Sequence, residues 1–258
     1  WQGTVPNVLS EWIKKIYMPQ IEKQVEDKGF ITGYYVNLND YNDVTKGING
    51  WVSSPKLSSG YAAIRNRVGV LIETHSLKPY KDRVFATKAF IEETIKIANS
   101  QNETIKNNTK LADQEVLWKY GNEKENYPLG FKLTKDTVNY LWKGIKADLV
   151  NSKITGSKVV KYNGEKYETY VKYLPYLKAS KFAKVPKCYI VPQEWTEVIN
   201  VLKLHGVEYA QINNDTLINC EQYKFTNIKF ADLPYEGRFQ PTFDLDTNKI
   251  NAKVNKGD

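Results

Sequence analysis

The sequence contains few of the residues that build metal centres and disulfide scaffolds. Among its 258 residues there are two histidines, His75 and His205, and two cysteines, Cys188 and Cys220. Two cysteines are too few for a disulfide-dense scaffold or a four-thiolate zinc site, and they leave open whether one bridge forms. A histidine-based zinc site made from this chain alone would need both histidines plus carboxylates.

Long apolar runs and several catalytic motifs are also missing. No run of roughly 18 apolar residues occurs, so we expect no membrane span. No signal peptide is visible, as expected of a mature, trimmed or excised chain. The glycine-rich nucleotide loops, the His-Glu-x-x-His zinc motif and the Gly-x-Ser-x-Gly nucleophile motif do not occur. These absences argue against nucleotide-binding, zincin and α/β-hydrolase functions.

Positive charge is in excess but is not concentrated. The chain has 37 Lys and Arg against 29 Asp and Glu, a formal net charge of +8. Basic residues are spread along the sequence without a run of five or six, so a polyanion partner is permitted but not required. We expect neither a nucleic acid nor a membrane as partner. Hydrophobic residues make up 41% of the chain, which is enough for a sizeable core.

Three-to-four spacing of apolar residues predicts a series of helices. The first of them contains Pro19, which predicts a kink or two helices at that point. Pro79 precedes another helix at a position that favours proline. The predicted helices cover residues 6–28, 60–66, 80–100, 102–120 and 193–204.

Short apolar or alternating runs predict strands, most of them in the second half of the chain. Residues 68–72 form an apolar run without alternation, typical of a strand buried on both faces of a mixed or parallel sheet. Asn163 and Gly164 predict a hairpin turn. Further strands are predicted at residues 33–38, 159–162, 167–173, 189–191 and 223–230. We therefore predict an α/β fold with a mixed sheet over residues 1–120, followed by a β-rich domain over residues 121–258.

Glu73 ends the apolar run of residues 68–72. In open α/β sheets, ligands bind beyond the carboxyl ends of the strands. A glutamate at that position can accept a proton from a metal-bound water. The alternative is a strand-end carboxylate that caps the following turn.

Residues 59–80, together with Arg83, resemble the last catalytic segment of zinc metallocarboxypeptidases, the carboxypeptidase A-like funnelins. Residues 34–40 and 191–206 are similar to a bacterial branch of that family with a β-rich extension. The resemblance implies that residues 1–120 are the C-terminal portion of a carboxypeptidase-like catalytic domain and residues 121–258 an accessory domain. It also implies a zinc-dependent hydrolase that releases C-terminal residues from peptides, with Glu73 as general base.

The family's zinc ligands are missing from the matched region. They are a His-x-x-Glu pair and a later histidine, which precede the general base, and no such set precedes Glu73. The resemblance thus implies zinc held by ligands outside this chain, no metal ligand within it, and an inactive isolated chain. The partner would be the missing N-terminal part of the same domain. His205 and Glu208 also spell His-x-x-Glu, but we interpret His205 as the end of a helix followed by a C-terminal glycine, Gly206.

Several residues around Glu73 are candidates for binding a peptide substrate. His75 follows Glu73 by two residues, so in an extended chain both side chains face the same side. His75 is therefore expected either to contact substrate or orient the Glu73 carboxylate, or to form an ordinary hydrogen bond. The resemblance makes Tyr61 a candidate for the family's substrate-facing tyrosine. A basic cluster either meets a substrate carboxylate or pairs with acids such as Asp82. Its members are Arg65, Arg67, Lys78 and Arg83.

An alternative function remains open. The chain would then be a non-enzymatic peptide- or glycan-binding module derived from a degenerate peptidase. Its 6 Trp, 18 Tyr and 9 Phe residues permit stacking on sugars, although in a β-rich region they more commonly form core and edge strands. With the peptidase function we expect a periplasmic or secreted location.

Overall fold

The computed structural model describes residues 3–76, 78–121 and 125–257. It contains both helices and sheets, which confirms the mixed α/β content. Contacts divide the chain into two units, one ending at Pro186 and one beginning at Lys187. The predicted boundary near residue 120 concerns independent folding and stays a prediction. Within the described part of the chain, no helix is long and apolar enough to cross a membrane.

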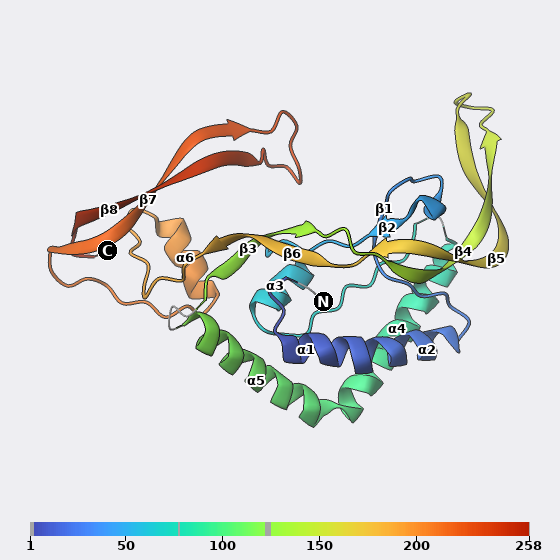
Figure 1. Cartoon of the computed structure of the whole chain (residues 1–258), viewed down its shortest axis with the longest axis horizontal. Coiled ribbons are helices and arrows are strands. Elements are labelled where there is room, and N and C mark those ends of the chain that lie inside the picture. The colour runs from blue at the N-terminus through green and yellow to red at the C-terminus, as the bar shows by residue number, and fades with distance from the viewer. Residues whose placement is uncertain (1–2, 77, 122–124, 258) are drawn as a thin grey trace. The chain divides into compact units, whose positions relative to one another are not determined.

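The chain begins with one continuous helix of three parts (Figure 1). α1 covers Asn7–Trp12, a π-helical turn covers Ile13–Tyr17, and α2 covers Met18–Glu26. Pro19 lies at the start of α2, where its missing N–H falls beside the wider π-helical turn. The predicted interruption at Pro19 is therefore a change of helix type rather than a break.

The other helices of the first unit follow their predicted ranges closely. α3 covers Ser58–Ile64, α4 covers Tyr80–Ser100 and α5 covers Asn102–Tyr120. Pro79 precedes the first residue of α4 as predicted, because proline needs no hydrogen-bond partner at a helix start.

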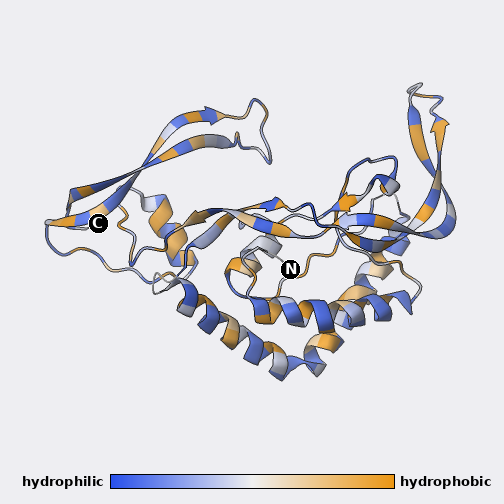
Figure 2. Cartoon of the chain, in the orientation of Figure 1, coloured by the Kyte–Doolittle hydropathy of each residue, from blue (hydrophilic) through white to orange (hydrophobic). Residues whose placement is uncertain are grey.

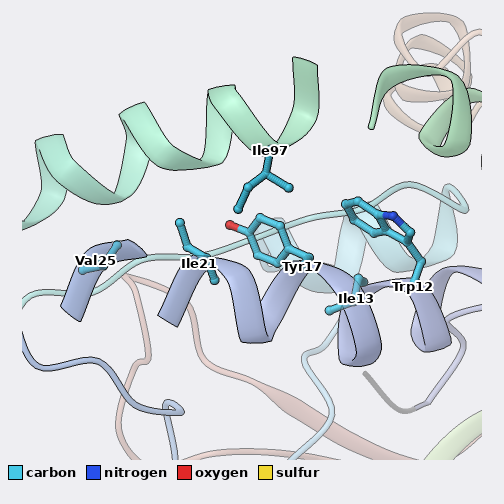
Figure 3. Packing of buried hydrophobic residues seen from close by; sticks show 6 residues of the cluster. All are labelled: Trp12, Ile13, Tyr17, Ile21, Val25 and Ile97. Atoms are coloured by element: carbon cyan, nitrogen blue, oxygen red, sulfur yellow. The ribbon is translucent and has the colours of Figure 1, made fainter. Parts of the chain in front are cut away.

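A hydrophobic cluster joins the first helix to α4. Ile97 of α4 lies over Tyr17 (Figure 3), whose hydroxyl is 2.8 Å from Oγ1 of Thr94. The three-to-four spacing of the apolar residues places them on one helical face. The buried members of the cluster are Trp12, Ile13, Tyr17, Ile21, Val25 and Ile97.

An ion cluster joins the residues just after α2 to α4. Glu93 of α4 is 5% exposed, and its Oε1 lies 2.7 Å from Nζ of Lys28 and 2.8 Å from Nζ of Lys96. The hydrogen bond from Lys28, followed by that from Lys96, holds the pKa of Glu93 below its usual value. A buried carboxylate is tolerated here because it is paired with two ammonium groups.

The first unit has a four-stranded sheet in the order β1-β2-β5-β4. β1 (Asn37–Leu38) pairs antiparallel with β2 (Ile48–Asn49), and β2 pairs parallel with β5 (Lys158–Leu174). β4 (Val138–Asn151) pairs antiparallel with β5. A separate antiparallel pair is formed by β3 (Tyr127–Leu133) and β6 (Leu177–Ala183).

Polar and aromatic contacts attach this sheet to α2. Nζ of Lys143 on β4 lies 2.6 and 2.7 Å from the two carboxylate oxygens of Glu26. The rings of Tyr34, Tyr140 and Tyr173 also contact one another, with centroids 5.2 to 6.0 Å apart. Tyr34 stacks on Tyr140, while Tyr173 is tilted to Tyr34 and meets Tyr140 edge to face. Partial burial, followed by the nearby carboxylate of Glu22, raises the pKa of Tyr34 to about 12.

The predicted hairpin turn at Asn163 and Gly164 is wrong. β5 runs through both residues, and the chain reverses at residues 152–157 instead. The register passes from Ile145–Lys166 to Ala147–Tyr162, so the two residues lie in a bulge. Gly164 has φ +85°, a conformation that such a bulge and a tight hairpin turn both require.

The second unit contains one helix and one hairpin. α6 covers Thr196–Leu204 and ends at His205 and Gly206, whose φ is +64° as predicted for a C-terminal glycine. β7 (Thr216–Phe230) pairs antiparallel with β8 (Pro241–Val254). The predicted strand at residues 189–191 is absent from the structure, and both cysteines are free.

The chain exposes more surface than monomeric proteins of its mass usually expose. Its accessible surface is 19002 Å², whereas two monomeric proteins with the masses of the two units would expose roughly 14,000 Å² together. Figure 2 shows apolar residues recurring along β7 and β8 as well as along the helices. Many apolar side chains therefore lie at the surface.

Replacing Ile97 by alanine should lower the free energy of unfolding by about 2–5 kcal/mol, because it leaves a cavity against Tyr17 and Ile21. Urea unfolding followed by circular dichroism measures the change. Ile95→Ala on the same helix is the control, since Ile95 is 62% exposed and should change stability by less than about 0.5 kcal/mol. Equal losses in the two variants would contradict the described core.

Candidate functional site

The segment of residues 65–79 connects α3 to α4 and carries Glu73. The strand predicted at residues 68–72 is wrong, because no strand forms there. Val70 and Leu71 are 37% and 55% exposed. Within the described ranges, no backbone hydrogen bond joins residues 68–74 to another segment. An apolar run becomes a strand only when a neighbouring strand satisfies its backbone groups, and the described residues supply none beside it.

Arg67 anchors the start of this segment to α5. Its Nη1 donates to both carboxylate oxygens of Asp113, at 3.0 and 3.2 Å, and to the carbonyl oxygens of Arg65 and Asn66. The amide of Asn66, which has φ +54°, donates to Asp113 at 3.1 Å. Partial burial alone would raise the pKa of Asp113, but the hydrogen bonds from Arg67 and Asn66 hold it below its usual value. Arg67 thus binds within the chain, and its predicted role toward substrate stays a prediction.

An open groove of about 520 Å³ lies where the segment meets α4. The guanidinium carbon of Arg83 lies 5.6 Å from the centre of the Tyr80 ring. Nε of Arg83 is buried without a hydrogen-bond partner among the described residues. A planar, permanently charged group in this position can pair with a carboxylate. The lining residues are Thr74, Tyr80, Arg83, Val84, Thr87, Lys88, Ile91 and Glu92.

His75 and Lys78 form the turn that follows Glu73. The backbone N–H of Lys78 donates to the carbonyl of His75 at 3.1 Å, and both side chains are exposed. The His75 ring meets the Tyr162 ring edge to face, with centroids 6.4 Å apart. Glu73 itself is exposed. In the chain, Glu73 therefore lies between Arg67, which is paired with Asp113, and a turn whose His75 contacts Tyr162 of β5.

The two remaining candidates lie on or just after α3. Tyr61 is 39% exposed within the helix, and Arg65 is the exposed residue at its C-terminal end. Neither lines the groove. Thr74 and Arg83 both line the groove. The structure also shows Asp113 paired with Arg67 and Tyr162 in contact with His75, two neighbours that no sequence pattern indicated.

Within the described ranges, no group of three His, Cys, Asp or Glu side chains converges as a metal site would require. The described residues thus form no complete zinc site, and the expected zinc-dependent reaction would need ligands from another segment.

Asp113→Asn should lower the melting temperature at neutral pH and have little effect near pH 3. The folded-state pKa of Asp113 is depressed, so its pairing with Arg67 stabilises the fold above the unfolded pKa of about 3.9 and is lost as the pH falls. Because both side chains are about half exposed, the loss should stay below about 1 kcal/mol. Asp82→Asn is the control, and an equal loss at both pH values would contradict the ion pair.

The purified, tag-free chain should hold no stoichiometric zinc after dialysis, since it has only two histidines and His205 lies at the end of a helix. Metal analysis by plasma emission spectroscopy measures the content. One tightly held zinc per chain, lost in His205→Ala, is the result that would overturn this expectation.

Comparison with known proteins adds no relative to this description. No family model, no curated protein and no solved structure matches the chain. Its function must therefore be argued from the side chains described above.

Proposed function

We propose that this chain supplies the general base and part of the substrate groove of a zinc-dependent carboxypeptidase-type hydrolase, whose zinc ligands lie outside these 258 residues. The observation that carries the proposal is the apolar run of residues 68–72, which lacks backbone partners among the described residues and leads directly into Glu73.

The run has the composition of an interior strand without the sheet that such a strand needs. Val70 and Leu71 expose apolar side chains, and no described residue pairs with the backbone N–H and C=O groups of the run. Adding strands on either side would satisfy these groups and cover the side chains. Glu73 would then stand at the carboxyl end of a strand, where α/β sheets hold their ligands.

Glu73 has the chemistry of a base for hydrolysis. Its carboxylate accepts a proton from the water that attacks the peptide carbonyl, and returns a proton to the departing amine nitrogen. The two transfers leave Glu73 ionised, as it was at the start. Zinc, when bound, would polarise the carbonyl and acidify the water. The described residues contain no complete ligand set for it.

The groove beside Glu73 offers contacts for the C-terminal residue of a peptide. Arg83 is a cation in the groove lining that can pair with the terminal carboxylate. Val84 and Ile91 provide apolar wall for the side chain that is released. The same proposal places the hydrolase outside the cytoplasm, as a periplasmic or secreted protein that acts on peptides there.

Glu73→Gln should reduce peptide hydrolysis by about 10²–10⁴-fold in a polypeptide that joins this chain to a segment carrying the zinc ligands. Glutamine keeps the shape of the side chain but cannot accept the proton. Thr74→Ala and Lys78→Ala are comparison variants that should lower turnover far less, since neither side chain moves a proton and loss of a substrate contact acts on KM. Release of the C-terminal residue is measured together with the melting temperature and the zinc content.

The same measurement separates the proposal from its alternatives. If Glu73 only caps a turn, Glu73→Gln should lower the free energy of unfolding by about 1 kcal/mol and leave turnover largely intact. A non-enzymatic binding module would show no hydrolysis in the wild type. Hydrolysis by Glu73→Gln within about threefold of wild type would exclude Glu73 as the base.

A further inference from the structure

The β1–β2 ribbon has one face that is turned away from the core. Asn37 pairs with Asn49, and the N–H of Asn39 donates to the carbonyl of Gly47 at 3.0 Å. Extending this antiparallel register by two residues places Tyr35 opposite Trp51. Because side chains alternate along a strand, the aromatic–amide face consists of Tyr35, Asn37, Asn39, Asn49 and Trp51.

The aromatic end of this face is open to solvent. The Tyr35 and Trp51 rings meet edge to face, with centroids 4.9 Å apart and planes at 72°. Tyr35 is 63% exposed and Trp51 is 37% exposed. Two large rings held at this angle form a corner with apolar walls, although each carries a polar group at its rim.

The amide end is ordered by its own hydrogen bonds. Nδ2 of Asn49 donates to Oδ1 of Asn39 at 2.7 Å, and Nδ2 of Asn39 donates to the carbonyl of Lys46 at 3.1 Å. Asn37 is exposed, and its amide has no partner among the described residues. The row therefore keeps free donors and acceptors next to the two rings, and none of its five side chains is charged.

The opposite face fixes the ribbon to the unit. Ile48 is fully buried, and Tyr34 stacks on Tyr140 with centroids 5.2 Å apart. β2 also pairs with β5 at Tyr173 and Leu174. The aromatic–amide face is thus held in place before any ligand arrives, which reduces the entropy lost on binding.

We propose that the aromatic–amide face binds a neutral oligosaccharide. A pyranose ring has an apolar C–H face that stacks on an aromatic ring, and hydroxyl groups that both donate and accept hydrogen bonds, as asparagine amides do. Nucleic acid would need cations along the face to meet its phosphates, and the five side chains include none. This binding is separate from hydrolysis at Glu73, and neither proposal depends on the other.

The test is calorimetric titration of the full chain with cellohexaose, chitohexaose, xylohexaose and mannohexaose. At least one of these neutral probes should bind saturably. Trp51→Ala and Tyr35→Ala should each weaken that binding by about tenfold or more, since each removes a stacking surface. Asn37→Ala should weaken it by about threefold. Tyr41→Ala is the matched control, because Tyr41 is 86% exposed but lies outside the face.

Three results would overturn the proposal. The first is that none of the four probes, at about 5 mM, produces heat of binding in the titration or a chemical-shift change in NMR spectra of the chain. Another is sugar binding that is unchanged in both Tyr35→Ala and Trp51→Ala. The third is tight, salt-sensitive binding of polyuridylate or hexagalacturonate in preference to the neutral sugars. Melting curves of each variant confirm that a lost signal does not come from unfolding.

Discussion

The first unit depends on the continuous helix formed by α1, the π-helical turn and α2, because both of its layers pack on this helix. One side carries the apolar cluster that meets Ile97 of α4. The other side carries Glu26, which binds Lys143 of β4. Val68 packs against the same apolar cluster, so the segment that leads to Glu73 is positioned by this helix as well. A helix with contacts on two sides explains why a protein with a small core holds helices and sheet together.

Exposed apolar residues occur along the whole chain, and those on α4 support the proposed function. α4 buries Ala89 and Ile97 on one side, while Val84, Ile91 and Ile95 stay exposed along the rest of the helix. A helix that is apolar on two sides is typical of a layer covered on both faces. The surface excess of roughly 5,000 Å² over two monomers of these masses is also larger than a standard protein interface. Added strands beside residues 68–72 would cover part of this surface and would give that run its sheet.

Sequence patterns predicted the structures that depend on near neighbours. Periodicity and helix-end signals gave α4 and α5 to the residue, since helical hydrogen bonds join residues four apart. The failures all involve distant partners. Residues 68–72 satisfy every local rule for a strand but lack a neighbour, and Gly164 meets the same backbone requirement in a bulge as in a turn. The pairing of Arg67 with Asp113 spans 46 residues, so neither residue marks the other in the sequence.

Glu73 is exposed, and this exposure bears on the proposed chemistry. Carboxylates serve best as bases where water is excluded and the site is rigid. In this chain Arg67 anchors the segment to Asp113 six residues before Glu73, and the His75 ring contacts Tyr162 after it. Residues 68–74 have no backbone partner among those described. Strands that paired with residues 68–72 would order this stretch and exclude water from Glu73 in one step. Completion of the sheet and activation of the base are therefore, on this proposal, a single event, and an isolated chain with a correctly folded α4 and α5 would still lack both.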